Sequence, residues 1–255
     1  MSEQSGTTAR TGTTARRIVL VTGASSGIGE AVARELAAAG HHVVLAARRA
    51  ERLARVTAEI TGAGGSASTA VLDVTDPQAY ARVVEAVVAE HGRLDVLVGN
   101  SGVMLLSSMT SLLTAEWDRT VDVNVKGVLH GIAAALPHFL RQGSGHFVTT
   151  ASIGAHEVVP TAAVYCATKH AVWALMEGLR QDLPPTVRAT TISPGVVQSE
   201  LAQHITDPVA SAGMVEYRRS AIAPSAIGRA VAYAVGEPGD VDVNEVVVRP
   251  AAQRP

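Results

Sequence analysis

The chain has 255 residues, of which 47% are hydrophobic and 17% are charged, and 21 Lys and Arg against 23 Asp and Glu give a net charge of −2. This composition can bury a sizeable core and excludes a mainly disordered chain. The near-balance of charge supplies no attraction to nucleic acid or to an anionic membrane, and the 3% of aromatic residues argue against a platform for stacking bases. We therefore expect a small-molecule partner, with no nucleic acid and no membrane.

The first residues and the cysteine content predict the compartment. Residues 1–15 are rich in Ser, Thr and Gly and lack the apolar core of a signal peptide, so we expect them to form a disordered tail. Arg, His, Gly or Pro interrupts every apolar run before it reaches the roughly 18 to 20 residues of a membrane span. The single cysteine, Cys166, excludes an intramolecular disulfide. These features predict a soluble, cytoplasmic protein.

Apolar runs alternate with helix-like segments over residues 16–255, and no repeat or linker divides this part of the chain. Several runs are continuously apolar, as in parallel strands that helices cover on both faces. The alternation predicts a single α/β domain, a doubly wound, mainly parallel sheet of about seven strands. The predicted strands span 18–21, 43–46, 67–72, 94–98, 146–150, 187–192 and 245–248, and the predicted helices span 29–39, 51–62, 76–91, 115–141, 163–183 and 224–235.

A glycine-rich turn, TGASSGIG, lies at 22–29 between the first predicted strand and the first predicted helix. Its glycines permit a tight turn and a close approach of the backbone to a pyrophosphate, and the free amides at the start of the helix favour an anion. The alternative is a glycine-rich connection without a ligand. We expect the turn to bind a phosphate through Gly23, Ser25, Ser26, Gly27, Ile28 and Gly29.

Residues 198–223 form the least regular stretch, between the sixth predicted strand and the last predicted helix. An insertion at this point borders the carboxyl ends of the strands, where ligands bind in such sheets. We interpret it as a candidate substrate lid.

Further motifs follow the turn in a fixed order, and with it they resemble the short-chain dehydrogenase/reductase family over residues 16–250. The resemblance implies a Rossmann-type sheet of seven strands, a nicotinamide cofactor, and a homodimer or homotetramer built on the predicted helices at 115–141 and 163–183. The matching positions are Asp73, Val74, Asn100, Gly102, Asn124, Ser152, Tyr165 and Lys169 in the spacing Y-x-x-x-K, Pro194 and Gly195.

The residues after the second predicted strand bear on the choice between NADP(H) and NAD(H). Members of the family that prefer NAD usually have an acidic residue here, whereas this chain has Ala47 followed by Arg48 and Arg49. A guanidinium binds a ribose 2′-phosphate through charge-assisted hydrogen bonds. We therefore predict NADP(H), with Arg48 as the stronger candidate. The alternative is that both arginines form a solvated loop face beside Glu51.

The resemblance also implies how the adenine end of the cofactor binds. Asp73 would accept a hydrogen bond from the adenine amino group beside the Val74 amide. The alternative for Asp73 is a helix cap, which Thr75 or Asp76 would provide better.

At the nicotinamide end, Asn100 and Gly102 would approach the cofactor, although Gly99 stands where the family often has asparagine. The segment that begins with Pro194 and Gly195 would lie under the nicotinamide ring. Its Val197 backbone and Ser199 hydroxyl would hold the carboxamide. The resemblance implies hydride transfer from the pro-S face of that ring.

Tyr165 and Lys169 are four residues apart on a predicted helix, so both project from one face. Ser152 precedes Tyr165 by thirteen residues, the separation that the family shows for its catalytic serine and tyrosine. Lys169 and the cofactor's positive ring would lower the pKa of Tyr165, which would act as general acid/base. Ser152 would stabilise the developing alkoxide. Asn124 resembles the family asparagine that holds a water of the proton relay; its alternative is a hydrogen bond to local backbone.

We predict an NADP(H)-dependent oxidoreductase that acts on a carbonyl or alcohol. The segments ARRAERL and NEVVVRP look most like bacterial clavulanate-type aldehyde reductases and short hydroxy-acid dehydrogenases. One alternative is a catalytically idle NADP(H)-binding regulator, against which the complete set of four catalytic residues argues. Another is a sugar-nucleotide epimerase, which uses a different glycine spacing and an additional domain. No metal is expected, and pocket candidates are Met104, Ile153, His156, Val196, Leu201, His204 and Tyr217.

Overall fold

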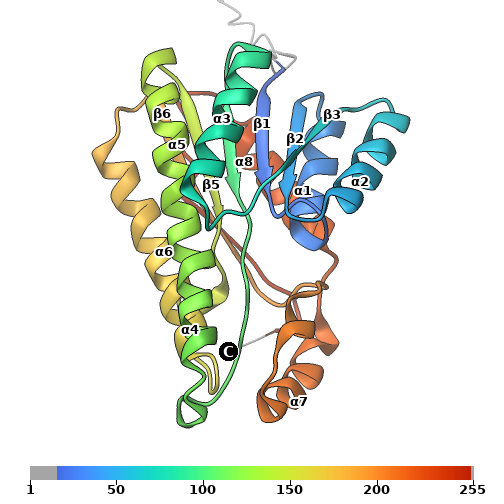
Figure 1. The fold of residues 1–255 in the computed structure, drawn as a ribbon, viewed down its shortest axis with the longest axis vertical. Helices are drawn as coiled ribbons and strands as arrows, with labels where there is room; N and C mark the ends of the chain where they lie inside the picture. The colour runs from blue at the N-terminus through green and yellow to red at the C-terminus, as the bar shows by residue number, and fades with distance from the viewer. Residues whose placement is uncertain (1–15, 254–255) are drawn as a thin grey trace, which may run out of the picture.

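The computed structural model describes residues 16–253, so the predicted tail at 1–15 lies outside the described residues. Seven strands form one parallel sheet in the order β3-β2-β1-β4-β5-β6-β7 (Figure 1). The order reverses direction between β1 and β4, which in doubly wound sheets marks the ligand crevice. The predicted seven-stranded fold is therefore confirmed. The strands are β1 (Ile18–Thr22), β2 (His42–Ala47), β3 (Ser66–Val71), β4 (Val96–Gly99), β5 (Gly145–Thr150), β6 (Val187–Pro194) and β7 (Glu245–Val248).

Helices cover both faces of the sheet because successive residues of each strand point to opposite sides. Val19 and Val21 of β1 are buried in the core cluster that includes Leu36 and Ile227, whereas Leu20 is buried in the cluster on the other face, with Phe139. The first face carries α1 (Gly27–Ala38), α2 (Ala50–Gly62) and α8 (Pro224–Gly236), and the second carries α3 (Pro77–His91), α5 (Gly127–Gln142) and α6 (Ala163–Asp182).

The single helix predicted at 115–141 is wrong in detail. The chain forms α4 (Thr114–Val121), a π-helical turn over Asp122–Lys126, and then α5. A π turn holds one more residue than an α turn, so it rotates the side chains that follow it, and such turns are frequent at functional sites. Here the turn contains Asn124, which is 1% exposed.

The segment at 198–223 is more regular than its sequence indicates. It contains short 3₁₀ turns at Leu201–His204 and Arg218–Ser220, and between them α7 (Pro208–Tyr217). The Asp207 side chain caps α7 by accepting hydrogen bonds from the backbone amides of Val209 and Ala210. Figure 1 shows α7 beyond the carboxyl ends of the strands, across from α4.

Close packing of the glycine-rich turn predicts the effect of a methyl group at Gly29. A Cβ there would lie 2.5 Å from Asn100 Nδ2 and 2.7 Å from the Gly23 carbonyl carbon. We expect Gly29→Ala to destabilise the protein by roughly 1–3 kcal/mol in denaturant unfolding, because both neighbours are held in place.

The matched control is Gly62→Ala in the last turn of α2, where an added Cβ meets no atom within 4 Å. This change should be neutral or stabilise by up to about 1 kcal/mol through loss of unfolded-state entropy. Equal effects of the two substitutions would contradict the packing account.

Candidate active site

A cavity of about 1370 Å³ opens at the carboxyl edge of the sheet. It is lined by segments that follow β1, β2, β3, β4, β5 and β6, by the start of α6, and by the segment at 198–223. The structure thus brings the predicted positions together from both halves of the chain. Of the predicted site residues, all but Gly29 and Asn124 line it: Gly23, Ser25, Ser26, Gly27, Ile28, Arg48, Arg49, Asp73, Val74, Asn100, Gly102, Ser152, Tyr165, Lys169, Pro194, Gly195, Val197 and Ser199.

The glycine-rich turn adopts the backbone that its glycines allow. Gly23 and Gly27 have φ of +66° and +58°, in the left-handed region that disfavours side chains. Ser26 is the N-cap of α1, and its side chain makes no capping hydrogen bond. The first amides of α1 therefore face the cavity region without a side-chain acceptor from Ser26, which suits an anion.

Arg49 is the arginine that contacts this turn. Its Nε and Nη2 donate to the Ser25 hydroxyl at 3.0 and 2.8 Å, and Nη2 also donates to the Ser26 hydroxyl at 2.7 Å. Arg48, the stronger candidate from the sequence, is exposed and lies near Asp73. Both arginines line the cavity, but the one that contacts the glycine-rich turn is Arg49.

The cap of α3 (Pro77–His91) is Asp76 and not Asp73. Asp76 caps α3, accepting hydrogen bonds from the amides of Gln78 and Ala79 at 2.9 Å each. Asp73 accepts from the Thr75 amide and hydroxyl at 3.0 and 2.8 Å. Burial raises the pKa of Asp73, but these hydrogen bonds and the charge of Arg48 outweigh it, so the net pKa is lowered. Asp73 is thus a cavity-lining carboxylate that is not needed as a cap.

Asn100 ties three strands together at their carboxyl ends. Its side-chain nitrogen donates to the Thr22 carbonyl at 3.2 Å, and its backbone amide donates to the Thr22 hydroxyl at 3.0 Å. Its side-chain oxygen accepts from the Thr150 hydroxyl at 3.2 Å. The sheet is therefore fastened here even though Gly99 stands where the family often has asparagine.

The start of α6 brings Tyr165 and Lys169 to the carboxyl end of β5. The Lys169 Nζ donates to the Thr150 carbonyl at 2.9 Å and lies 5.8 Å from the centroid of the Tyr165 ring. Ser152 is hydrogen-bonded to the Tyr165 side chain, and its hydroxyl oxygen also accepts from the Gly154 amide at 3.0 Å. The predicted trio of Ser152, Tyr165 and Lys169 is therefore assembled in one place.

Burial shifts the pKa values of Lys169 and Tyr165. It lowers the pKa of Lys169 to about 8, because the residue is only 6% exposed and its charged form loses contact with water. It raises the pKa of Tyr165 to about 12, although the hydrogen bond with Ser152 acts in the opposite direction. The expected lowering of the tyrosine pKa is therefore not produced by the protein groups alone, since desolvation of the phenolate outweighs the stabilisation that they provide.

Asn124 lies behind the trio and bonds to distant groups rather than to local backbone. Its side chain accepts from the Val103 amide at 2.8 Å and donates to the Val103 carbonyl at 2.9 Å. It also donates to the Thr168 hydroxyl at 3.1 Å, which in turn donates to the Tyr165 carbonyl at 2.7 Å. Asn124 thus connects the loop after β4 to the helix that carries Tyr165. Thr168 was not anticipated, because nothing in its sequence context marks it.

The segment after β6 is held by the chain's last described residue, Gln253. The Gln253 side chain accepts from the Val196 amide at 3.0 Å and donates to the Tyr217 hydroxyl at 2.5 Å. A Cβ at Gly195 would lie 3.1 Å from Pro250 Cδ, so the segment after β6 packs closely against the residues that follow β7. No local sequence pattern marks Gln253, since its partners lie 57 and 36 residues away.

Apolar residues form the cavity wall beside Tyr165. Buried Leu106, Cys166 and Ile205 pack in one cluster beside Tyr165. The pocket candidate His156 does not line the cavity and is a wrong assignment, because its ring bonds to Glu245 at 2.6 Å. The other candidates do line it: Met104, Ile153, Val196, Leu201, His204 and Tyr217.

Residues 16–253 contain neither a cluster of metal-binding side chains nor a membrane-spanning helix. No group of three or more His, Cys, Asp or Glu in this described part could hold a metal ion. Among the helices of the same residues, none combines the length and apolarity needed to cross a membrane.

The chain belongs to the short-chain dehydrogenase family and is an oxidoreductase: the protein-family model described as short chain dehydrogenase matches residues 17–210. An uncharacterized oxidoreductase of Staphylococcus saprophyticus is 42% identical over 240 residues, which cover 93% of this chain and 97% of the relative. One of Listeria innocua is 41% identical over 241 residues, with the same two shares.

Solved structures have the same fold. An alcohol dehydrogenase from the archaeon Thermococcus sibiricus, complexed with 5-hydroxy-NADP, has a TM-score of 0.84 at 29% identity, covering 94% of this chain and 99% of its own. A short-chain dehydrogenase/reductase from Burkholderia phymatum, in complex with NAD, has a TM-score of 0.85 at 25% identity, covering 91% and 88%.

The lowered pKa of Lys169 predicts how stability changes with pH. The folded protein releases this proton near pH 8, whereas an unfolded lysine holds it to about pH 10.4. Between these values the unfolded state binds more protons, so stability rises with pH. Relative to Lys169→Met, the wild type should gain about 1 kcal/mol per pH unit between pH 8 and 10 in denaturant unfolding. Parallel pH curves for the two proteins would refute the burial of a charged lysine.

Proposed function

We propose that the protein is an NADP(H)-dependent oxidoreductase that interconverts a carbonyl and an alcohol, with Tyr165 as the general acid/base. The observation that carries this proposal is the convergence of Ser152, Tyr165 and Lys169 at one end of a cavity whose other end holds Arg49 on a glycine-rich turn. Oxidoreduction needs a hydride carrier and a proton carrier side by side, and this cavity has room and groups for both.

The cavity residues fit a dinucleotide with a phosphate on its adenosine ribose. Gly23 and Gly27 have left-handed backbone in the turn between β1 and α1, and the N-terminus of α1 favours a pyrophosphate. Arg49 presents a guanidinium beside the Ser25 and Ser26 hydroxyls, and these donors suit a 2′-phosphate. The structural relatives were solved with NADP-type and NAD cofactors, so the choice between them rests on the arginine.

Other cavity residues would hold the remaining parts of the cofactor. Asp73 and Val74 would bind the adenine, and Asn100 and Gly102 would line the path to the nicotinamide. The backbone of Val197 and the hydroxyl of Ser199 would bind the carboxamide, on the segment that begins with Pro194 and Gly195.

The nicotinamide supplies the hydride when bound, and the chain's own residues handle the proton and the oxygen. Tyr165 gives its hydroxyl proton to the substrate oxygen, while the Ser152 hydroxyl donates a hydrogen bond to that oxygen as it gains negative charge. Lys169 binds the nicotinamide ribose and passes a proton towards Tyr165, since a pKa of about 8 lets Nζ release and regain a proton near neutral pH. Asn124 fixes the end of this relay through Thr168.

Two surfaces complete the proposal. The segment at 198–223 acts as a substrate lid, because it lines the cavity opposite α4 and contributes apolar residues to its far end. The chain assembles as a homodimer or homotetramer in the cytoplasm, through exposed apolar side chains of α4, α5 and α6: Val121, Leu129, Leu140 and Trp173.

Loss of the Tyr165 hydroxyl should strongly reduce turnover. We expect Tyr165→Phe to lower kcat by at least about 100-fold on a reactive carbonyl substrate, because no other group delivers the proton. NADPH affinity should change little. Tyr233→Phe is the control, since Tyr233 is 56% exposed on α8 and lies outside the cavity lining. Retained turnover in a folded Tyr165→Phe variant that binds NADPH would remove the acid/base role.

The position of Arg49 predicts which arginine determines cofactor preference. Arg49→Ala should weaken NADPH binding by roughly 10- to 100-fold and leave NADH binding within about twofold, because one charge-assisted contact is worth some 1.5–3 kcal/mol. Arg48→Ala should have a smaller effect. Arg55→Ala on the outer part of α2 serves as control. A larger effect at Arg48 than at Arg49 would reverse the assignment.

A further inference from the structure

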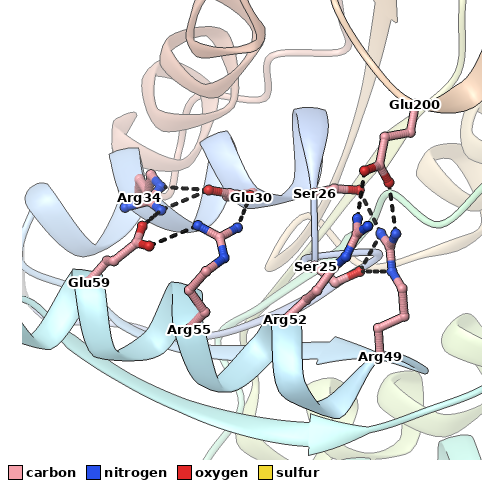
Figure 2. A network of polar contacts seen from close by, with 9 residues as sticks. All are labelled: Ser25, Ser26, Glu30, Arg34, Arg49, Arg52, Arg55, Glu59 and Glu200. Atoms are coloured by element: carbon pink, nitrogen blue, oxygen red, sulfur yellow. Dashed lines mark hydrogen bonds and ion pairs between the residues drawn. The ribbon is translucent and has the colours of Figure 1, made fainter.

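The carboxylate of Glu200 forms ion pairs with Arg49 and Arg52 beside the glycine-rich turn (Figure 2). One oxygen lies 2.7 Å from Arg49 Nη1 and the other 2.6 Å from Arg52 Nη1. The hydrogen bonds from Arg49 and Arg52, helped by one with Ser26, outweigh burial and hold the pKa of Glu200 at about 2. The chain therefore places a permanent anion on the donors that the proposed function assigns to a phosphate.

Glu200 reaches this position from the opposite side of the cavity. It follows β6 in the segment at 198–223, and 151 residues separate it from Arg49. Its neighbour Ser199 is the residue proposed to hold the carboxamide, and the Ser199 carbonyl accepts from Arg218 at 2.6 Å. The Glu200 contact thus bridges the adenosine end of the cavity and the lid.

A second charge network on the same two helices shows what is particular to Glu200. Glu59 bridges Arg34 and Arg55 on the outer surface of α1 and α2, and Glu30 joins the same arginines (Figure 2). These four residues lie outside the cavity lining, whereas Glu200 and Arg49 belong to it. The ion pairs of Glu30 and Glu59 already join α1 to α2. The ion pairs of Glu200 with Arg49 and Arg52 are therefore not needed to hold these two helices together.

We infer that Glu200 is an internal competitor for the cofactor's 2′-phosphate: it occupies Arg49 and Arg52, and it must leave them when a phosphate-bearing cofactor binds. A carboxylate and a phosphate that share the same guanidinium repel each other. A cofactor with a free 2′-hydroxyl brings no such charge and leaves the pair intact. Glu200 therefore weakens NADPH binding selectively, and this inference rests on the proposed cofactor site.

The test compares two substitutions that each remove one negative charge. Purified wild type, Glu200→Gln and Glu59→Gln are titrated with NADPH and with NADH by fluorescence at one fixed ionic strength. Glu200→Gln should bind NADPH roughly 3- to 10-fold more tightly, the scale of one or two partly exposed ion pairs, with NADH affinity within about twofold. Glu59→Gln should change neither affinity by more than about twofold.

A third variant shows whether the gain passes through the arginines. In Glu200→Gln/Arg52→Ala, NADPH affinity should fall back towards the wild-type value, because a freed Arg52 contributes part of the gain. Thermal unfolding of each variant confirms that it is folded.

The outcomes separate this inference from the proposed function. Unchanged or weaker NADPH binding in Glu200→Gln overturns the competitor role, and weaker binding means that Glu200 orients Arg49 for the phosphate. An equal gain in Glu59→Gln also overturns it, by reducing the effect to net charge. A wild type that prefers NADH overturns the proposed NADP(H) preference, while a gain for NADPH confined to Glu200→Gln still supports the competition.

Discussion

The buried ammonium of Lys169 constrains the whole catalytic end of the cavity. Removing an ion from water costs several kcal/mol unless it is hydrogen-bonded, and this one donates to the Thr150 carbonyl at the end of β5. That bond fixes α6 against the sheet, and with it Tyr165, which is four residues earlier. Ser152, two residues beyond Thr150, is placed by the same contact. The alignment of the trio is therefore a consequence of where the lysine can be satisfied.

The parallel sheet brings the site residues together from distant parts of the chain. All strands run in the same direction, so the segments that leave their carboxyl ends meet on one edge although they are far apart in sequence. Asn100 fastens the edge by bonding Thr22 and Thr150. Both ends of the cavity are thus built on one frame, and the 198–223 segment contacts it through the ion pairs of Glu200 with Arg49 and Arg52.

Local sequence patterns predicted much of the fold and many of the residues that line the cavity. Continuous apolar runs predicted seven parallel strands, and the turn TGASSGIG and the Tyr165 and Lys169 spacing predicted cavity residues, because these depend on neighbours within a few positions. The π turn at Asn124 could not be read, since it depends on the distant Val103 backbone. The positions of Arg49 and His156 depend on Glu200 and Glu245, which lie 151 and 89 residues away. The direction of the Tyr165 pKa depends on burial, which the spacing of residues does not encode.

The central claim is direct hydride transfer assisted by Tyr165, and an isotope-transfer assay tests it most directly. Wild type is incubated with NADPH deuterated at the pro-S position of the nicotinamide and a panel of aldehydes and ketones, and the alcohol products are analysed by mass spectrometry. The account predicts deuterium in the alcohol with wild type, and at least about 100-fold slower formation of that deuterated alcohol with Tyr165→Phe. Alcohol formed without deuterium from either labelled face of the nicotinamide would contradict it.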